Sequence, residues 1–310
     1  MPRTRRMVIK GEPGVYHVVS RTALSGLPFK DTDKDKLLSI INRYSRLFFT
    51  EVLGFSLMGN HFHLVVRMLP ESRFTDEDII KRFHSHYGED VDIPEGHISY
   101  YREKFSSLAS YIKEIKQTFS VYFNRKNRRK GTLWGERFKS VIVENGDTLV
   151  NCLAYVELNP VRAGLVEKPE DYRWNSIGYH VQTGNKDGFL SADFGVKTFA
   201  SVGKKERLRL YRRYVYEAGA IDHPEKPGAK KIQKDVMKKV RKKNFKLTRT
   251  ERFLARTRYF SDSGVIGSKT FVTEMFHQFQ DLFQNPGKRK PKPVHGVDGV
   301  YSLKRLSELI

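Results

Sequence analysis

The sequence predicts an α+β fold, in which a mostly antiparallel sheet carries helices packed against it. Two observations support this class. Short β-rich runs alternate with longer segments of helical apolar spacing. From residue 15 to residue 159 they follow the order strand, helix, hairpin, helix, strand and helix, which is typical of an antiparallel sheet with packed helices.

The first strand is predicted over residues 15–21, which are rich in β-branched and aromatic side chains. Alternation along this strand places His17 on the same face as Val15 and Val19, which favours a packed histidine over a metal ligand. An amphipathic helix is predicted next, over residues 31–49, because its apolar residues recur at helical spacing.

A β-hairpin is predicted over residues 55–66, with Gly59 and Asn60 as its two-residue turn. His61 and His63 then point to the same face of the second strand, and the apolar residues beside them point to the other. A lone His-x-His pair more often lines the solvent face of a half-covered sheet. Two parallel imidazoles can also form half of a metal site.

The middle of the chain alternates between polar and apolar segments. Residues 70–103 are polar and are predicted to form an inserted loop with a short helix near residues 77–86. A second long helix is predicted over residues 107–127, because apolar side chains form one stripe along it. A loop over residues 131–139 then leads to a short strand at residues 141–143.

A third helix is predicted over residues 147–159, ending before Pro160, which disfavours helical geometry in the preceding residue. Tyr155 and Asn159 are four residues apart and share one helix face. Brought over the two histidines, they would give a cage of two nitrogens and one oxygen beside a nucleophile. A buried core tyrosine is the alternative for Tyr155, and Tyr122 on the preceding helix is the rival nucleophile.

The charge is strongly positive and unevenly distributed. The 310 residues include 57 Lys and Arg against 35 Asp and Glu, a net charge of +22 with a pI near 9.9. Residues 201–310 carry a net charge of +16, from 27 basic and 11 acidic side chains, which leaves +6 for the first 200 residues. A polyanion is therefore the expected partner.

The composition also predicts a compartment. The single cysteine, Cys152, excludes an internal disulfide framework and fits a reducing environment. No apolar run reaches the length of a membrane span, and the basic residues 1–6 lack the apolar segment of a signal peptide. We expect a soluble, cytoplasmic protein, which would be nucleoid-associated if its polyanionic partner is DNA.

Beyond residue 182 the patterning loosens, and three regions are predicted: a catalytic domain over 1–182, a helical extension and linker over 183–229, and a basic helical accessory DNA-binding region over 230–310. In the last of these, two helices on either side of a glycine turn at residues 264–267 suggest a helix-turn-helix-like DNA binder. The second of these helices would open at Ser268.

Five separated motifs, in this order, resemble those of the REP-associated tyrosine transposases, single-tyrosine relatives of the HUH relaxases and replication initiators. The resemblance covers roughly residues 10–180. The motifs are YHVVSR (residues 16–21), MGNHFH (58–63), GTLWGERFK (131–139), YVELNPVRAGL (155–165) and YRWNS (172–176).

The resemblance implies a ferredoxin-like antiparallel sheet with helices on one face. It implies a metal-dependent DNA transposase or endonuclease that cleaves and rejoins single-stranded or hairpin DNA through a 5′-phosphotyrosine. His61 and His63 would bind Mg²⁺ or Mn²⁺, and Tyr155 would be the nucleophile. Asn159 stands where relatives often carry a glutamine as third ligand.

The resemblance also implies a DNA surface, on a protein that is a monomer or a homodimer. Arg137 and Arg162 would contact DNA or support the fold, and aromatic rings would stack on unpaired bases. The candidates for DNA contact are Arg21, Trp134, Arg137, Arg162, Tyr172 and Trp174.

Two other functions fit parts of the sequence. A non-catalytic DNA-binding regulator that keeps the fold would bind DNA without forming a covalent adduct. A zinc or iron enzyme acting on small molecules through His61 and His63 would need a third strong ligand, and the sequence offers no acidic or cysteine candidate at motif spacing.

Overall fold

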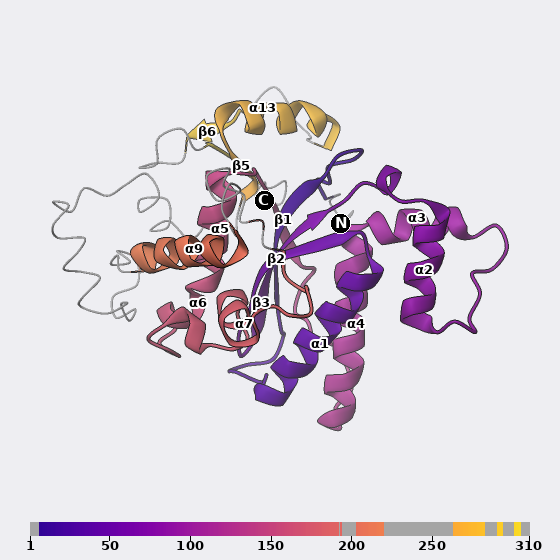
Figure 1. Cartoon of the computed structure of the whole chain (residues 1–310), viewed down its shortest axis with the longest axis horizontal. Coiled ribbons are helices and arrows are strands. Elements are labelled where there is room, and N and C mark those ends of the chain that lie inside the picture. The colour runs from indigo at the N-terminus through magenta and orange to yellow at the C-terminus, as the bar shows by residue number, and fades with distance from the viewer. Residues whose placement is uncertain are drawn as a thin grey trace, which may run out of the picture.

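The computed structural model describes residues 6–191, 193, 203–219, 263–282, 290–293 and 301–304. Within these residues, seven strands form one sheet in the order β2-β3-β1-β4-β5-β7-β6 (Figure 1). Neighbouring strands are antiparallel except β4 and β5, which run parallel. The strands are β1 (Gly14–Arg21), β2 (Thr50–Leu57), β3 (His61–Met68), β4 (Lys139–Val143), β5 (Ser263–Gly267), β6 (Lys292–Pro293) and β7 (Tyr301–Lys304).

The hairpin of β2 and β3 forms at the predicted turn. The Met58 amide donates to the carbonyl of His61 (2.8 Å), which leaves Gly59 and Asn60 as the two turn residues. Glycine is needed at the first of them because a Cβ there would lie 2.9 Å from Cβ of Leu27. The loop that carries Leu27 therefore packs directly on the turn.

One face of the sheet packs against helices rich in aromatic side chains. Phe62, Leu64 and Val66 of β3 point to this face and are fully buried in its apolar cluster. The predicted helices at 31–49, 77–86 and 107–127 are confirmed here. The helices on this side are α1 (Asp31–Leu47), α2 (Asp76–Tyr87), α3 (Ile98–Ser106) and α4 (Leu108–Lys126).

Helices also cover the opposite face, so the expectation of helices on one face is wrong. Val15, Val65 and Val141 point to this second face from three neighbouring strands, and such an apolar surface must itself be covered. The helices that contribute to this second cluster are α5 (Asp147–Glu157), α6 (Asn159–Arg162), α7 (Ser176–Thr183) and α9 (Lys204–Gly219).

The third predicted helix is present but shorter than expected. It ends at Glu157, and Leu158 joins it to the single helical turn of α6. Pro160 lies in the first turn of α6, where its missing N–H costs no helical hydrogen bond. Helix α5 therefore presents Tyr155 near its carboxyl end.

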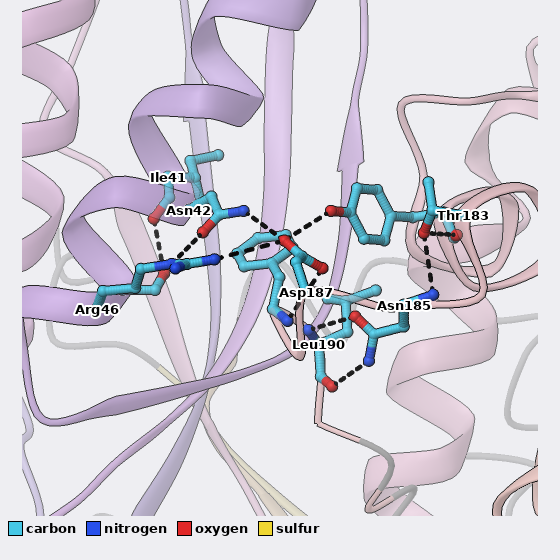
Figure 2. A network of polar contacts seen from close by, with 10 residues as sticks. Ile41, Asn42, Arg46, Thr183, Asn185, Asp187 and Leu190 are labelled. Carbon is cyan, nitrogen blue, oxygen red and sulfur yellow. Dashed lines mark hydrogen bonds and ion pairs between the residues drawn. The ribbon is translucent and has the colours of Figure 1, made fainter.

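Residues 185–191, which follow α7, are fixed on the sheet and on α1, so the loosening expected beyond residue 182 is not found in this segment. The carboxylate of Asp187 accepts hydrogen bonds from Asn42 Nδ2 (2.9 Å) and the Tyr179 hydroxyl (3.0 Å), and Arg46 forms an ion pair with it at 3.7 Å (Figure 2). Leu190 then forms a parallel bridge with β2. This segment closes the outer edge of β2.

The C-terminal part extends the central sheet. The turn expected at residues 264–267 is strand β5 instead, because Val265 and Ile266 are buried and pair with β4. Strand β5 therefore occupies the position of the turn in the expected helix-turn-helix. Residues 230–262 of the predicted accessory region, including the helix expected before the glycine turn, lie outside the described residues.

The helix predicted to open at Ser268 is confirmed as α13 (Lys269–Gln278), with the Ser268 hydroxyl accepting from the Phe271 amide (3.2 Å). No helix within the described ranges is long and apolar enough to span a bilayer. The remaining short helical turns are η1 (Glu71–Arg73), η2 (Pro169–Asp171) and η3 (Gln280–Leu282).

Candidate active site

His61 and His63 point to the same face of β3, as predicted, and this is the face covered by α5. Their ring centroids are 5.2 Å apart. His61 is half-buried, whereas His63 is only 4% exposed, so the open face expected for both is wrong for His63. The pair therefore lies where the sheet passes beneath the carboxyl end of α5.

The Nδ1 atoms of both histidines have hydrogen-bond partners. His61 Nδ1 lies 2.7 Å from Oδ1 of Asn60, which is an acceptor, so this Nδ1 carries the proton and the ring lone pair is on Nε2. His63 Nδ1 lies 2.9 Å from Nε2 of His17. Each ring is thus oriented by a partner on its Nδ1 side.

The electrostatic surroundings keep His63 neutral. Burial holds the pKa of His63 well below its usual range, and electrostatic repulsion between a protonated His63 and the neighbouring histidines, Arg21 and Arg162 acts in the same direction. A neutral imidazole is the form that donates a lone pair to a metal ion. His63 is therefore ready to act as a ligand at neutral pH.

His17 belongs to this site, contrary to its interpretation as a packed histidine. It is fully buried, its ring lies nearly parallel to that of His63 with an interplanar angle of 12°, and the centroids are 5.2 Å apart. Its neighbours Val15 and Val19 are apolar, which hid this role in the sequence. The signal that could have found it is its position on the strand that pairs with the histidine strand.

Tyr155 lies over the histidines. Its ring is edge-on to His63 at 5.8 Å and to His17 at 6.0 Å, and the residue is 7% exposed. Leu153 and Val156, its neighbours on α5, are fully buried in the cluster beneath the helix. Their packing sets the rotation of α5 and so places Tyr155 at the site.

Arg162 supplies a positive charge beside Tyr155. Its guanidinium carbon lies 5.2 Å from the centre of the Tyr155 ring, and Nη1 donates to the Tyr155 carbonyl at 3.2 Å. Burial lowers the pKa of Arg162 to about 10, and the interaction with Tyr155 opposes that shift. The side chain still carries its charge at neutral pH, next to the candidate nucleophile.

Asn159 is close to Tyr155, but its amide nitrogen is used within the helix. Nδ2 donates to the carbonyls of Tyr155 and Val156, both at 3.2 Å, and so satisfies the carboxyl end of α5. Its role as third metal ligand stays a prediction. Among the described residues, no three His, Cys, Asp or Glu side chains converge in a metal-binding group.

A positively charged cleft adjoins the histidines. It has a volume of about 390 Å³, and Arg21, Arg137 and Lys139 are its three cations. Arg21 lies directly opposite His61 in the pairing of β1 with β3. The structure thus brings together two of the predicted DNA-contacting arginines and adds Lys139, which was not predicted. The cleft is lined by Val19, Ser20, Arg21, Thr22, Gly135, Glu136, Arg137 and Lys139.

Trp134 lies in the core on the other face of the sheet, which removes it as a stacking platform. It is 7% exposed, its ring packs against Phe62 and Phe119, and its Nε1 donates to the Lys116 carbonyl at 3.0 Å. Within the motif of residues 131–139, Trp134 therefore has a structural role, because its packing anchors the loop that carries Arg137.

Tyr172 and Trp174 are buried as well. The Trp174 indole nitrogen donates to Asp35 at 2.8 Å, and the Tyr172 hydroxyl donates to the Leu57 carbonyl at 2.7 Å. Both therefore serve packing in this structure. Tyr122, the rival nucleophile, projects from α4 on the face opposite the histidines, where its ring packs on Phe119.

Comparison with models of protein families and with curated proteins finds no match. Among solved structures, the chain is similar to a REP-associated tyrosine transposase bound to a REP hairpin, with 20% sequence identity and a TM-score of 0.41. The alignment covers 59% of this chain and 87% of that one.

Proposed function

We propose that this protein is a metal-dependent DNA transposase or endonuclease that cleaves and rejoins single-stranded or hairpin DNA through Tyr155. The observation that carries the proposal is the arrangement of Tyr155, which stands edge-on to His63 and His17 with Arg162 over its ring. A phenol next to oriented imidazoles and a cation suits attack on a phosphodiester.

In the proposed reaction, the Tyr155 oxygen attacks the phosphorus and the bond from phosphorus to the 3′ oxygen breaks. The products are a 5′-phosphotyrosine and a strand that ends in a free 3′-hydroxyl. Attack by a 3′-hydroxyl on the phosphotyrosine reverses the step and rejoins DNA. For the first attack, the phenolic oxygen must come within about 3–3.5 Å of the phosphorus.

Two groups of residues would assist this step. A phenol with an ordinary pKa near 10 is a weak nucleophile at neutral pH, and the charge of Arg162 favours its ionised form. His61 and His63 would hold a divalent ion, Mg²⁺ or Mn²⁺, with Asn159 as the proposed third ligand. When bound, this ion would polarise a non-bridging phosphate oxygen.

The basic cleft would hold the DNA backbone next to the reacting phosphate. Arg21, Arg137 and Lys139 place three positive charges around one cavity, and Arg21 is the cross-strand neighbour of His61. Arginine binds phosphate with a planar pair of donors, which fixes orientation as well as charge. The cleft would therefore position the strand that Tyr155 attacks.

A covalent-adduct assay tests the proposal. Labelled hairpin and single-stranded DNA are incubated with the full chain and Mn²⁺ or Mg²⁺, and a protein–DNA band that survives SDS is expected. Chelation of the metal should abolish the band. Tight binding of DNA with no adduct under any of these conditions would favour the DNA-binding regulator and overturn the enzymatic proposal.

A further inference from the structure

We propose that His17 is a positioning residue whose Nε2 accepts a hydrogen bond from the Nδ1–H of His63 and so holds His63 in the tautomer whose Nε2 binds a metal ion. The inference rests on the proposed metal site and adds a residue to it. It assigns His17 a role through His63, without direct contact with the metal or with DNA.

The strand register places the two rings together. Val19 is the direct partner of His63 and Val65 is the direct partner of His17, so the two histidines are diagonal neighbours on one face of β1 and β3. Their nitrogens lie 2.9 Å apart and their rings are nearly parallel, at 12°. Both side chains are buried, so water does not compete for this hydrogen bond.

A hydrogen bond between two neutral imidazoles has two possible directions. Either His63 Nδ1–H donates to His17 Nε2, or His17 Nε2–H donates to His63 Nδ1. Only the first leaves the lone pair of His63 on Nε2. In metal sites the second ring nitrogen of a histidine ligand commonly donates to an acceptor such as a carboxylate, a backbone carbonyl or water, which fixes the tautomer and the ring orientation, and His17 Nε2 would be the acceptor here.

His61 shows the same arrangement independently. Its Nδ1 donates to Oδ1 of Asn60, which also leaves its lone pair on Nε2. Two neighbouring histidines thus have an acceptor next to Nδ1, one from the hairpin turn and one from the adjacent strand. Both His61 and His63 would then have their lone pair on Nε2, available to a metal ion. This accounts for the buried His17 next to Nδ1 of His63.

Hydrogen bonding also argues that His17 is not itself a ligand. Its Nε2 is occupied by His63 Nδ1, and the residue is fully buried. The described residues contain no group of three His, Cys, Asp or Glu side chains suited to a metal ion. His17 therefore acts behind the ligand.

Metal-free protein provides the first test. Nitrogen-15 NMR of the imidazoles in the unmodified chain should show His63 protonated on Nδ1 and His17 unprotonated on Nε2. The opposite tautomers, with His63 protonated on Nε2, would overturn the proposal. This measurement needs neither a variant nor a metal ion, so a folding defect cannot obscure it.

Variants with added Mn²⁺ provide the second test. His17→Phe removes the acceptor and should weaken Mn²⁺ binding by about 10–100-fold in calorimetry. His17→Gln keeps an acceptor oxygen and should recover most of the affinity. Pulsed EPR of the unmodified protein should detect two imidazole nitrogens bound to Mn²⁺. Three bound nitrogens would show that His17 is a ligand and would contradict its role as a positioning residue.

His61→Ala separates this inference from the proposed function. If His61→Ala binds Mn²⁺ as tightly as the unmodified chain, the proposed metal site itself fails. If His61→Ala loses Mn²⁺ while folded His17→Phe keeps full affinity, only the role of His17 is overturned.

Discussion

The two faces of the central sheet are built from the same strands and serve different purposes. On β3, Phe62 and Leu64 point to α1 and α4 and pack in an aromatic cluster, whereas His61 and His63 point to α5. The α1 face is apolar along the whole of β3. The α5 face of β3 carries His61, His63 and Arg67, and Val65 is its one apolar side chain.

This difference shows how the fold positions chemistry. Burial of the apolar face fixes the register of β3, because a slip of one residue would exchange the two sets of side chains. The histidines are then oriented by hydrogen bonds, not by shape alone. Stability and reactivity are thus assigned to alternate residues of one strand, and substitutions on the two faces should have separable effects.

The largest expected effect compares the tyrosines of the two faces. Tyr155→Phe should abolish the covalent adduct while keeping metal and DNA binding, because only the hydroxyl is removed. Tyr122→Phe, across the sheet on α4, should keep most of the activity. Mass spectrometry of the nuclease-trimmed adduct identifies the peptide, and nucleotide mass on the Tyr122 peptide would reverse the assignment.

The second-largest expected effect is a difference in stability and cleavage between variants of Phe62 and His61, which are neighbours on β3. Phe62→Ala should lower the free energy of unfolding by about 3–5 kcal/mol, because it leaves a cavity in the aromatic cluster. His61→Ala, next to it, should change stability by less than about 1 kcal/mol and abolish cleavage, since His61 is half-buried. Urea denaturation beside the cleavage assay tests both. Equal destabilisation would show that His61 is structural.

A smaller effect concerns a buried carboxyl on the α5 side. Glu157 accepts hydrogen bonds from the hydroxyls of Ser176 (2.5 Å) and Tyr211 (2.7 Å), and burial raises its pKa from 4.5 to about 7. A carboxyl whose pKa is raised by folding stabilises the fold fully below about pH 4.5. That stability is lost as the pH rises through about 7, by about 3 kcal/mol in total.

Glu157→Gln should therefore be more stable than the unmodified protein at pH 8, and should lose this advantage towards pH 5. Asp33→Asn on the α1 side is the matched control, because Asp33 is also buried but pairs with Lys126 at 2.6 Å. It should be destabilising at both values of pH. Urea unfolding at pH 5 and pH 8 checks the pair, and the same pH dependence in both variants would contradict the assignment to Glu157.

The smallest effect concerns the basic cleft. Arg137→Gln should weaken DNA binding a few-fold and reduce the slope of log affinity against log salt by about 1, as expected for the loss of one phosphate contact. Arg125→Gln is the control, since Arg125 is exposed on α4 behind the other face. Fluorescence anisotropy over a range of salt measures both. Identical slopes for the two variants would remove the cleft from the DNA interface.

Much of the fold can be predicted from patterns within short segments of the sequence. The α+β class, the hairpin turn at Gly59 and the shared face of His61 and His63 follow from periodicity and turn chemistry, which are properties of short segments. The position of Tyr155 near the histidines was inferred from helical spacing together with separated motifs. Its place over the pair appears in the structure.

Other features depend on contacts that no short segment encodes. His17 has apolar neighbours, and its role follows only from the pairing of β1 with β3. Trp134 precedes Arg137 by three positions, yet Trp134 is buried in the core and Arg137 lines the basic cleft. The apolar pair Val265 and Ile266 is too short to be distinguished from a turn until β4 is seen beside it.

The parallel pairing of β4 with β5 has a consequence for the order of folding. Val143 and Ile266 are partners in the sheet but are separated by more than a hundred positions in the chain. During synthesis, β4 remains an edge strand with unpaired backbone groups until β5 has been made. Such an edge invites pairing with another chain. Closure over so long a separation is slow relative to the local hairpin of β2 and β3. The nascent protein is therefore most prone to misassociation after Tyr155 has been translated and before strands β5 to β7 have been made.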